Sequence, residues 1–226
     1  MTGYIILIIA VLIPSWIVSA RFKSKVKKYA KIALNSRLSG REIAERMLYE
    51  NGIFDVQIVV AQGLLSDHYN PATKTVALSP DVYHGRSVVS AMIAAHECGH
   101  AVQHAQAYSF LQFRSALVPV VSFSSRFISW VILAGIILIN TFPQIMLAGI
   151  ILFGLTTLFS FVTLPVEFDA SRRAALWLER TSITTSGEHV AVKDGLRMAA
   201  MTYVVAALGS LATLIYYVML FLGSRD

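Results

Sequence analysis

The chain has 226 residues, of which 56% are hydrophobic and only 14% are charged, and its mean hydropathy is +0.63. An average soluble domain has roughly 25% charged residues, so this composition excludes an ordinary soluble protein and predicts extensive contact with lipid. A single cysteine, Cys98, excludes an internal disulfide and suits a reducing compartment.

The first apolar segment covers residues 4–20, contains no charge and carries Trp16 near one end. A cleaved signal peptide is the alternative interpretation, but the basic residues follow this segment instead of preceding it. We therefore expect residues 1–20 to form an N-terminal transmembrane anchor.

Residues 21–116 contain most of the turn-forming residues, and we expect them to form a folded region outside the membrane. Ser39 and Glu42 fit a capping box that opens a helix running to about Tyr49. Residues 56–60 and 75–78 have strand character and predict a small β hairpin or meander. A long helix without proline is predicted over residues 87–107.

Residues 117–164 are predicted to form a transmembrane hairpin. Its first arm ends near Phe142, its second arm runs from Ile145 to Leu164, and Pro143 and Gln144 form a tight turn between them. Residues 165–202 are expected to form cytoplasmic helices. Residues 203–226 form the predicted C-terminal transmembrane helix.

The basic residues predict the orientation of these spans. With the N-terminus outside, four spans place 18 of the 19 Lys and Arg residues on one side, and Arg225 is the exception. The positive-inside rule makes that side cytoplasmic. The net charge of +6 is therefore a topology signal, with attraction to the lipid bilayer as a secondary effect, and it does not indicate nucleic-acid binding. The predicted fold class is a mainly α, polytopic membrane protein with about four transmembrane helices and a cytoplasmic α+β portion.

The predicted helix over residues 87–107 carries the run His96-Glu97-Cys98-Gly99-His100. Residues four apart on a helix are separated by about 6 Å along the axis and about 40° around it, so both imidazoles can bind one Zn²⁺. Glu97 projects beside such an ion and can take a proton from a metal-bound water. The alternative is that His96 and His100 are core histidines without a metal. Burying two histidines and a glutamate together is then costly unless each side chain finds a hydrogen-bond partner.

A catalytic zinc ion needs a third protein ligand. His104 continues the spacing but lies about 12 Å from His96 along the axis, too far for easy convergence on one ion. Glu167 follows the third span directly and is the better candidate. The alternative role for Glu167 is an interfacial charge in the first turn of a helix that follows Pro165.

Several widely separated blocks carry a family pattern. They are Asp67-His68-Tyr69, Thr73-Lys74-Thr75, Val82-Tyr83, Gly85-Arg86-Ser87, residues 94–105, residues 163–174 and Thr202-Tyr203-Val204. In these blocks, which extend over nearly the whole chain, the sequence resembles the YugP-type family of bacterial neutral membrane zinc metallopeptidases. It is more distantly similar to HtpX-like and CAAX prenyl proteases, in which a Glu-x-x-x-Asp element supplies the third ligand.

The resemblance implies zinc peptidase chemistry at the bacterial plasma membrane, with residues 21–116 as a zincin-like cytoplasmic metallopeptidase region. It implies His96 and His100 as zinc ligands and Glu97 as the base. Glu167 would be the third ligand, which makes the set gluzincin-like. The aspartate of the Glu-x-x-x-Asp element falls at Ser171 in this chain, which has Asp169 nearby instead.

The resulting hypothesis is hydrolysis of a peptide or protein substrate by a Glu-activated, zinc-bound water at the cytoplasmic membrane face. The substrate would lie extended along residues 75–78. Candidates for stabilising the oxyanion or the ligands are His104, Tyr108, Asp169 and Arg172.

Two alternatives remain open. A non-catalytic, zinc-stabilised membrane scaffold would require a fourth protein ligand. An intramembrane-cleaving metalloprotease would require the helix over residues 87–107 to be a span, which its Glu97, its histidines and its glutamines argue against.

Overall fold

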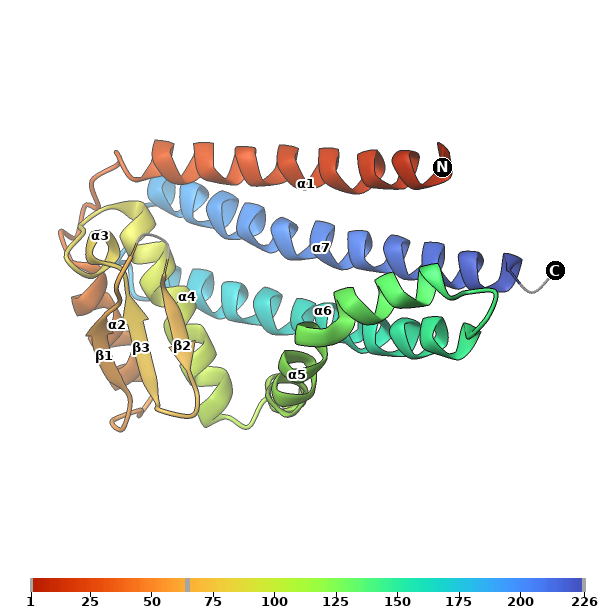
Figure 1. Cartoon of the computed structure of the whole chain (residues 1–226). Helices are drawn as coiled ribbons and strands as arrows, with labels where there is room; N and C mark the ends of the chain where they lie inside the picture. The colour runs from red at the N-terminus through yellow and green to blue at the C-terminus, as the bar shows by residue number, and fades with distance from the viewer. Residues whose placement is uncertain (1, 64–65, 225–226) are drawn as a thin grey trace. The chain divides into compact units, whose positions relative to one another are not determined.

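The computed structural model describes residues 2–63 and 66–224, and the chain in it is mainly helical (Figure 1). Arg225, the expected exception to the charge asymmetry, lies outside the described residues. The elements in chain order are α1 (Thr2–Tyr29), α2 (Gly40–Glu50), β1 (Gln57–Val60), β2 (His68–Asn70), β3 (Thr75–Leu78), α3 (Pro80–Tyr83), α4 (Val88–Ala105), α5 (Ser109–Ile137), α6 (Pro143–Arg180) and α7 (Ser186–Gly223).

The chain divides into two compact units. Unit 1 comprises Met1–Val18, Gln112–Leu164 and Thr202–Asp226, and unit 2 comprises Ser19–Leu111 and Pro165–Met201. The boundaries between the units fall inside α1, α5, α6 and α7, so each of these helices contributes residues to both.

Unit 1 contains the apolar stretches of the long helices. Among the described residues, α5, α6 and α7 are long and apolar enough to cross a membrane. The predicted N-terminal anchor lies in α1, which is not among these three helices. A fourth span therefore remains a prediction.

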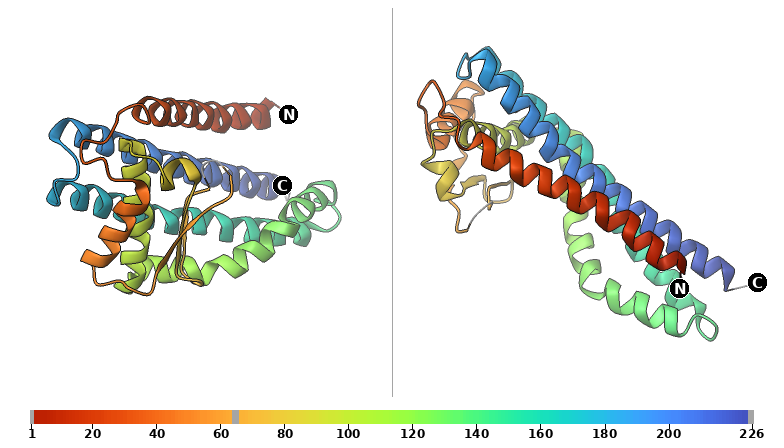
Figure 2. Two further views of the ribbon diagram at one scale, coloured as in Figure 1. Left: turned by 90° about the vertical axis from the view of Figure 1, so that its left-hand side faces the viewer. Right: turned by 90° about the horizontal axis from the view of Figure 1, so that it is seen from above.

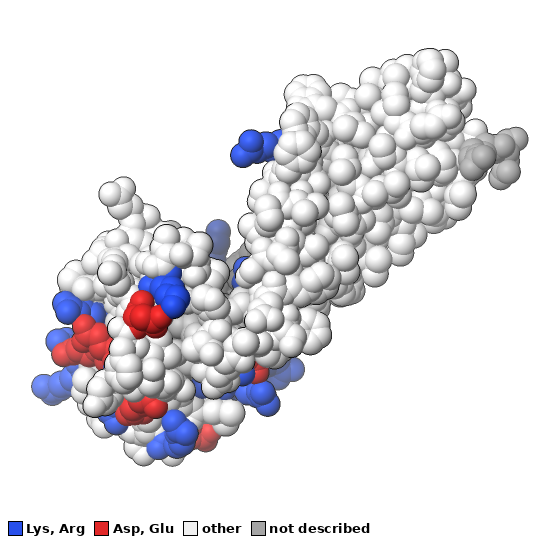
Figure 3. All heavy atoms as spheres, turned by 90° about the horizontal axis from the view of Figure 1, so that it is seen from below, with Lys and Arg blue, Asp and Glu red and all other residues white. Residues whose placement is uncertain are grey.

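The surface of unit 1 is that of a protein in lipid. The large side chains of Trp16, Phe123, Trp130 and Ile137 are 66–73% exposed. Arg114 and Arg126 are the only charged residues in its described part. On the face drawn in Figure 3, the charged side chains gather over unit 2, and unit 1 is almost free of them. Exposure of apolar side chains has no cost in free energy when the surrounding solvent is hydrocarbon instead of water.

In unit 1, the ribbons of α6 and α7 run side by side (Figure 2), and small residues let neighbouring helices approach closely. A Cβ atom added to Gly135 of α5 would lie 2.7 Å from the Cα of Met146 in α6. Between α6 and α7, the hydroxyls of Thr157 and Ser210 share a hydrogen bond of 2.7 Å. Close backbone contact and such hydroxyl bonds are the usual means by which helices associate in membranes.

The two prolines of α6 do not act as predicted. Pro143 is the first residue of α6, and the turn from α5 lies before it, over residues 138–142. Proline suits the first helical position because the N–H it lacks would have no helical acceptor there. Pro165 lies inside α6, which continues through it without interruption. No new helix therefore begins after Pro165, and the helix-capping role considered for Glu167 is wrong.

Unit 2 has a conventional hydrophobic core, in which α2 and α4 pack together. Ile43 and Ala44 of α2 and Ala91 and Ala95 of α4 are all fully buried. The predicted capping box at Ser39 is confirmed. The Ser39 hydroxyl accepts from the Glu42 N–H at 3.3 Å, and the Glu42 carboxylate accepts from the Ser39 N–H at 2.7 Å.

The small sheet of unit 2 differs from the predicted hairpin or meander. Its strand order is β1-β3-β2, with β1 parallel and β2 antiparallel to β3 (Figure 1). The two predicted strands are neighbours, but they run in the same direction because the chain crosses between them through β2. The hairpin partner of β3 is β2, a strand that was not predicted from the sequence.

Candidate metal centre

The two histidines of the motif lie on α4, which begins at the N-cap Ser87. The Ser87 hydroxyl accepts from the Ser90 N–H at 3.1 Å, which satisfies one of the free donors at the helix start. His96 and His100 are one turn apart, and their ring centroids are 4.8 Å apart with the planes at 80°. The helix thus presents both imidazoles on one face, as the spacing predicts.

Glu167 of α6 completes a cluster with these two rings. Its Oε2 lies 3.3 Å from His96 Nε2 and 3.6 Å from His100 Nε2, and the three side chains offer ligand atoms that all lie within 4.8 Å of one another. Glu167 is only 2% exposed and His100 only 7%. Two imidazole nitrogens and one carboxylate oxygen, converging at one buried point, are a donor set that fits zinc.

Gly99 permits this convergence. A Cβ atom at Gly99 would lie 2.7 Å from the carbonyl oxygen of Ala170 and 3.2 Å from its carbonyl carbon. These are backbone atoms of α6, which cannot rotate away as a side chain can. Glycine next to His100 therefore sets how closely α4 and α6 approach at the cluster.

Glu97, the predicted base, is buried beside the cluster and is 8% exposed. Burial raises the pKa of the Glu97 carboxyl to about 7; the His96 imidazole opposes this shift, and the carboxylates of Glu167 and Asp67 add to it. A carboxyl group with a pKa near 7 can accept and release a proton around neutral pH.

The ring nitrogens that face away from the cluster also have partners. His96 Nδ1 lies 3.2 Å from the hydroxyl of Ser171, the residue at the expected aspartate position. His100 Nδ1 lies 3.0 Å from Oε1 of Gln103. Gln103 was not predicted as a site residue, although a polar side chain one turn beyond His100 on an apolar helix is a usable signal.

Gln103 is fully buried and joins α4 to α6. Its Nε2 donates to the Val166 carbonyl at 2.8 Å and to the Asp169 carboxylate at 3.0 Å. Asp169 also accepts from the side chains of Arg172, at 2.9 Å, and Arg173. Two of the predicted stabilising residues, Asp169 and Arg172, are thus linked to His100 only indirectly. Arg172 contacts Asp169, Asp169 contacts Gln103, and Gln103 contacts His100.

The other predicted stabilising residues lie elsewhere in unit 2. His104 Nδ1 is 2.7 Å from the hydroxyl of Tyr69 on β2 and is not part of the cluster. Tyr108 lies beside the guanidinium of Arg173, with 6.0 Å from the guanidinium carbon to the ring centroid. Cys98 points toward α2, where its thiol lies 3.7 Å from the Ala44 carbonyl, as expected for a core residue.

The strand proposed to hold the substrate is not available for that purpose. β3, residues 75–78, is the central strand and pairs with β1 on one side and β2 on the other. Its backbone groups are therefore already hydrogen-bonded within the sheet. The prediction of substrate pairing along β3 is wrong.

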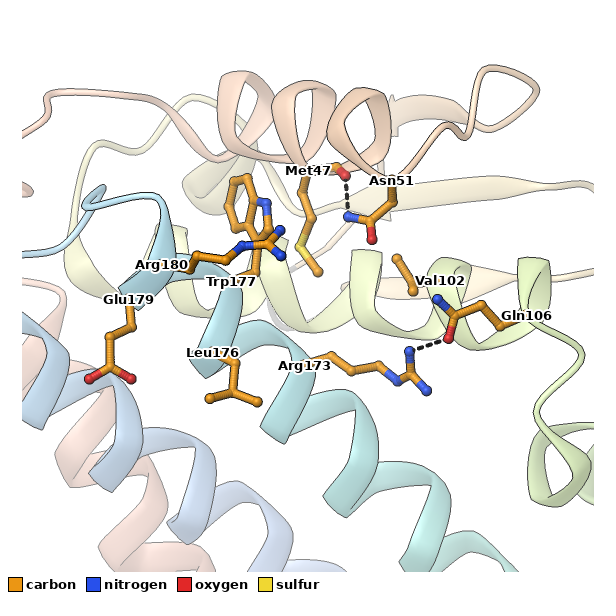
Figure 4. A pocket seen from close by; sticks show the side chains of 9 residues that line it. All are labelled: Met47, Asn51, Val102, Gln106, Arg173, Leu176, Trp177, Glu179 and Arg180. Carbon is orange, nitrogen blue, oxygen red and sulfur yellow. Dashed lines mark hydrogen bonds between the residues drawn. The ribbon is translucent and has the colours of Figure 1, made fainter.

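A separate cavity of about 480 Å³ lies between α2, α4 and α6 (Figure 4). None of the three cluster residues lines it. Arg173 and Gln106 form part of its wall, and Arg173 Nη1 donates to Gln106 Oε1 at 2.6 Å. The cavity therefore borders the chain of contacts that leads through Asp169 to Gln103.

The chain is similar to known proteins over almost its whole length. Residues 4–222 match a family model described as "Putative neutral zinc metallopeptidase". The chain is 40% identical over 223 residues to "Putative membrane protease YugP" of Bacillus subtilis (strain 168), covering 99% of this chain and 98% of that protein. No solved structure matches the chain. These findings confirm the family resemblance seen in the sequence.

Proposed function

The chain belongs to the neutral zinc metallopeptidase family whose model it matches, and from this premise we propose that it hydrolyses peptide bonds at a zinc site formed by His96, His100 and Glu167. The observation that carries the proposal is the convergence of three ligand atoms within 4.8 Å, with Glu97 adjacent to His96 on the same helix.

Zinc bound at this site would polarise the scissile carbonyl and acidify a coordinated water. Glu97 accepts a proton from the attacking water and later passes it to the leaving amine. The raised pKa of Glu97, about 7, supports both halves of this role near neutral pH. His96, His100 and Glu167 orient the site from two helices whose spacing Gly99 limits.

A catalytic function is favoured over a structural one. A closed structural zinc site has four protein ligands, whereas a catalytic site keeps one position open. Within residues 2–63 and 66–224, the cluster has three members, His96, His100 and Glu167. A buried carboxyl group beside it, Glu97, has no evident role in a purely structural site.

We propose a bacterial plasma membrane location with four spans and the site facing the cytoplasm. The proposed regions are an anchor (1–20), a metallopeptidase region (21–116), a transmembrane hairpin (117–164), cytoplasmic helices (165–202) and a C-terminal span (203–226). The basic residues of unit 2 and the apolar surface of unit 1 support this orientation. α4 is not among the candidate spans found in the described residues, which favours cleavage outside the bilayer.

The test uses purified full-length protein in detergent, with zinc content and hydrolysis of quenched-fluorescence peptides measured together. Glu97→Gln should retain zinc and lose activity by about 10²–10⁴-fold, because only the proton acceptor is removed. Glu167→Ala should lose both zinc and activity. Glu179→Gln, which changes an exposed carboxylate on the same helix as Glu167, is the matched control and should retain both. Full activity in Glu97→Gln would refute the mechanism.

A further inference from the structure

Gln103 lies one turn beyond the candidate ligand His100 on α4, and the role derived for it here rests on the proposed function of the zinc site. Gln103 is 0% exposed, although its side-chain amide carries two donor hydrogens and an acceptor oxygen. Burying an amide is costly unless both of its ends are hydrogen-bonded. A side chain so placed, one turn from a candidate ligand, is expected to have a specific role.

The surroundings of Gln103 fix the orientation of its amide. One end lies 2.8 Å from the Val166 carbonyl, which can only accept a hydrogen bond, so this end must be the NH₂ group. The same nitrogen lies 3.0 Å from the Asp169 carboxylate, which two arginine side chains also contact. The amide oxygen is therefore the atom that faces His100, at 3.0 Å from Nδ1.

The orientation of the amide determines the tautomer of His100. An amide oxygen cannot donate, so the hydrogen bond requires the proton to reside on His100 Nδ1. In the neutral ring, the lone pair is then on Nε2, the atom that lies 3.6 Å from Glu167 Oε2 within the cluster. Only this tautomer can present Nε2 to a metal ion.

His96 lacks an equivalent constraint. Its Nδ1 faces the Ser171 hydroxyl at 3.2 Å, and a hydroxyl group can donate or accept. The two candidate ligands therefore differ: the partner of His100 allows one neutral tautomer, and the partner of His96 allows both.

We propose that Gln103, held by Val166 and Asp169, is a positioning residue that fixes the Nδ1–H tautomer of His100 and so presents Nε2 to zinc. Asp169 acts through Gln103 and is a positioning residue as well. Partners of this kind typically change metal affinity by 10–100-fold when they are removed from a zinc site.

The first experiment compares Gln103→Met with the wild type. Methionine has nearly the same length and retains the packing but cannot accept from His100. Zinc affinity, measured by competition with a chromophoric chelator, should fall by about 10–100-fold. In metal-free, ¹⁵N-histidine-labelled protein, the NMR signature of the Nδ1–H tautomer, assigned with a His100→Ala variant, should be lost.

The matched control is Gln106→Met, which alters the exposed C-cap glutamine of α4, whose side chain contacts Arg173 and not His100. It should change zinc affinity by no more than about threefold, a small fraction of the effect expected when a direct partner is lost. Unchanged zinc affinity in a folded Gln103→Met, or an Nδ1–H signal that persists in it, would overturn the proposal.

If Gln103→Met does not fold, Asp169→Ala and Asp169→Asn decide the question. Asparagine still offers an oxygen to the Gln103 amide, so Asp169→Asn should weaken zinc binding less than Asp169→Ala does. Wild-type zinc affinity in Asp169→Ala would overturn the proposal. The tautomer measurement uses metal-free protein, so it tests the role of Gln103 even if the wild type proves not to be a zinc enzyme.

Discussion

The two units of this chain are stabilised by different kinds of interaction. In unit 1, bulky apolar side chains point outward, charges are nearly absent from the described part, and the helices meet through small residues and a few hydroxyl bonds. In unit 2, apolar side chains form a core, and ionisable groups are buried in defined hydrogen bonds.

The difference shows where specificity resides in the sequence. Many apolar residues can satisfy the lipid-facing positions of unit 1, because those positions require only compatibility with hydrocarbon. The buried positions of unit 2 accept few alternatives, because each polar group needs a partner. Single substitutions should therefore have large effects in unit 2 and small effects in unit 1, and the following predictions test this contrast.

The largest effect is expected at Glu97. Its folded-state pKa, about 7, is raised above the ordinary value of 4.5 by burial. The unfolded chain therefore releases this proton at lower pH, and metal-free wild type loses stability as the pH rises from about 4.5 through 7. Glutamine at position 97 cannot ionise, so Glu97→Gln should not lose this stability. The difference in the free energy of unfolding should be about 3 kcal/mol above pH 7.

The measurement is chemical denaturation of chelator-treated protein at pH 4 and pH 8. Glu97→Gln should be more stable than the wild type at pH 8 and equal to it at pH 4. Glu45→Gln, on the exposed face of α2, serves as control and should not be more stable than the wild type at pH 8. A stabilisation of equal size at both pH values would contradict burial of a charge as its cause.

The next effect compares one substitution in the two units. Gly99→Ala places a methyl group 2.7 Å from the Ala170 carbonyl oxygen, so α4 and α6 must separate at the cluster. We expect a loss of about 1–3 kcal/mol, as for other overpacked sites, together with weaker zinc binding. Gly154→Ala in unit 1 meets open space and should be neutral or slightly stabilising. Equal thermal stability and zinc content in the two variants would break the contrast.

A smaller effect is expected at the start of α2. Ser39→Ala removes the hydroxyl that accepts from the Glu42 N–H, which should cost about 1 kcal/mol of stability. Glu42→Gln retains an acceptor for the Ser39 N–H and should cost less. Thermal unfolding of the two variants beside the wild type provides the measurement.

The smallest effect belongs to the hydroxyl pair of unit 1. A double-mutant cycle of Thr157→Val and Ser210→Ala should give a coupling energy of about 0.6 kcal/mol, typical of such bonds within membranes. A coupling energy of several kcal/mol would show that unit 1 depends on polar specificity as unit 2 does.

The sequence predicted the features that depend on local spacing. The capping box at Ser39 and the convergence of His96 and His100 follow from residue spacing along a helix, and the structure agrees with them. Glu167 was selected for its place after an apolar segment and from the family resemblance, and its carboxylate does lie beside both rings.

Features that depend on long-range pairing were missed or predicted wrongly. The parallel direction of β1 and β3 is set by how the chain crosses between them, which strand propensity does not encode. The continuity of α6 through Pro165 was not foreseen, because proline favours the start of a helix and tolerance within one depends on neighbours. The role of Gln103 requires Val166 and Asp169, which lie more than 60 residues away.

The division of the candidate metal cluster between α4 and α6 has a consequence for biosynthesis. Glu167 is translated 67 residues after His100, so the ribosome must complete the intervening segment before the third ligand exists. At about 5–20 residues per second, this delay is roughly 3–13 s. Under the proposed function, a nascent chain therefore lacks the complete set of three zinc ligands until the residues between α4 and Glu167 have been synthesised.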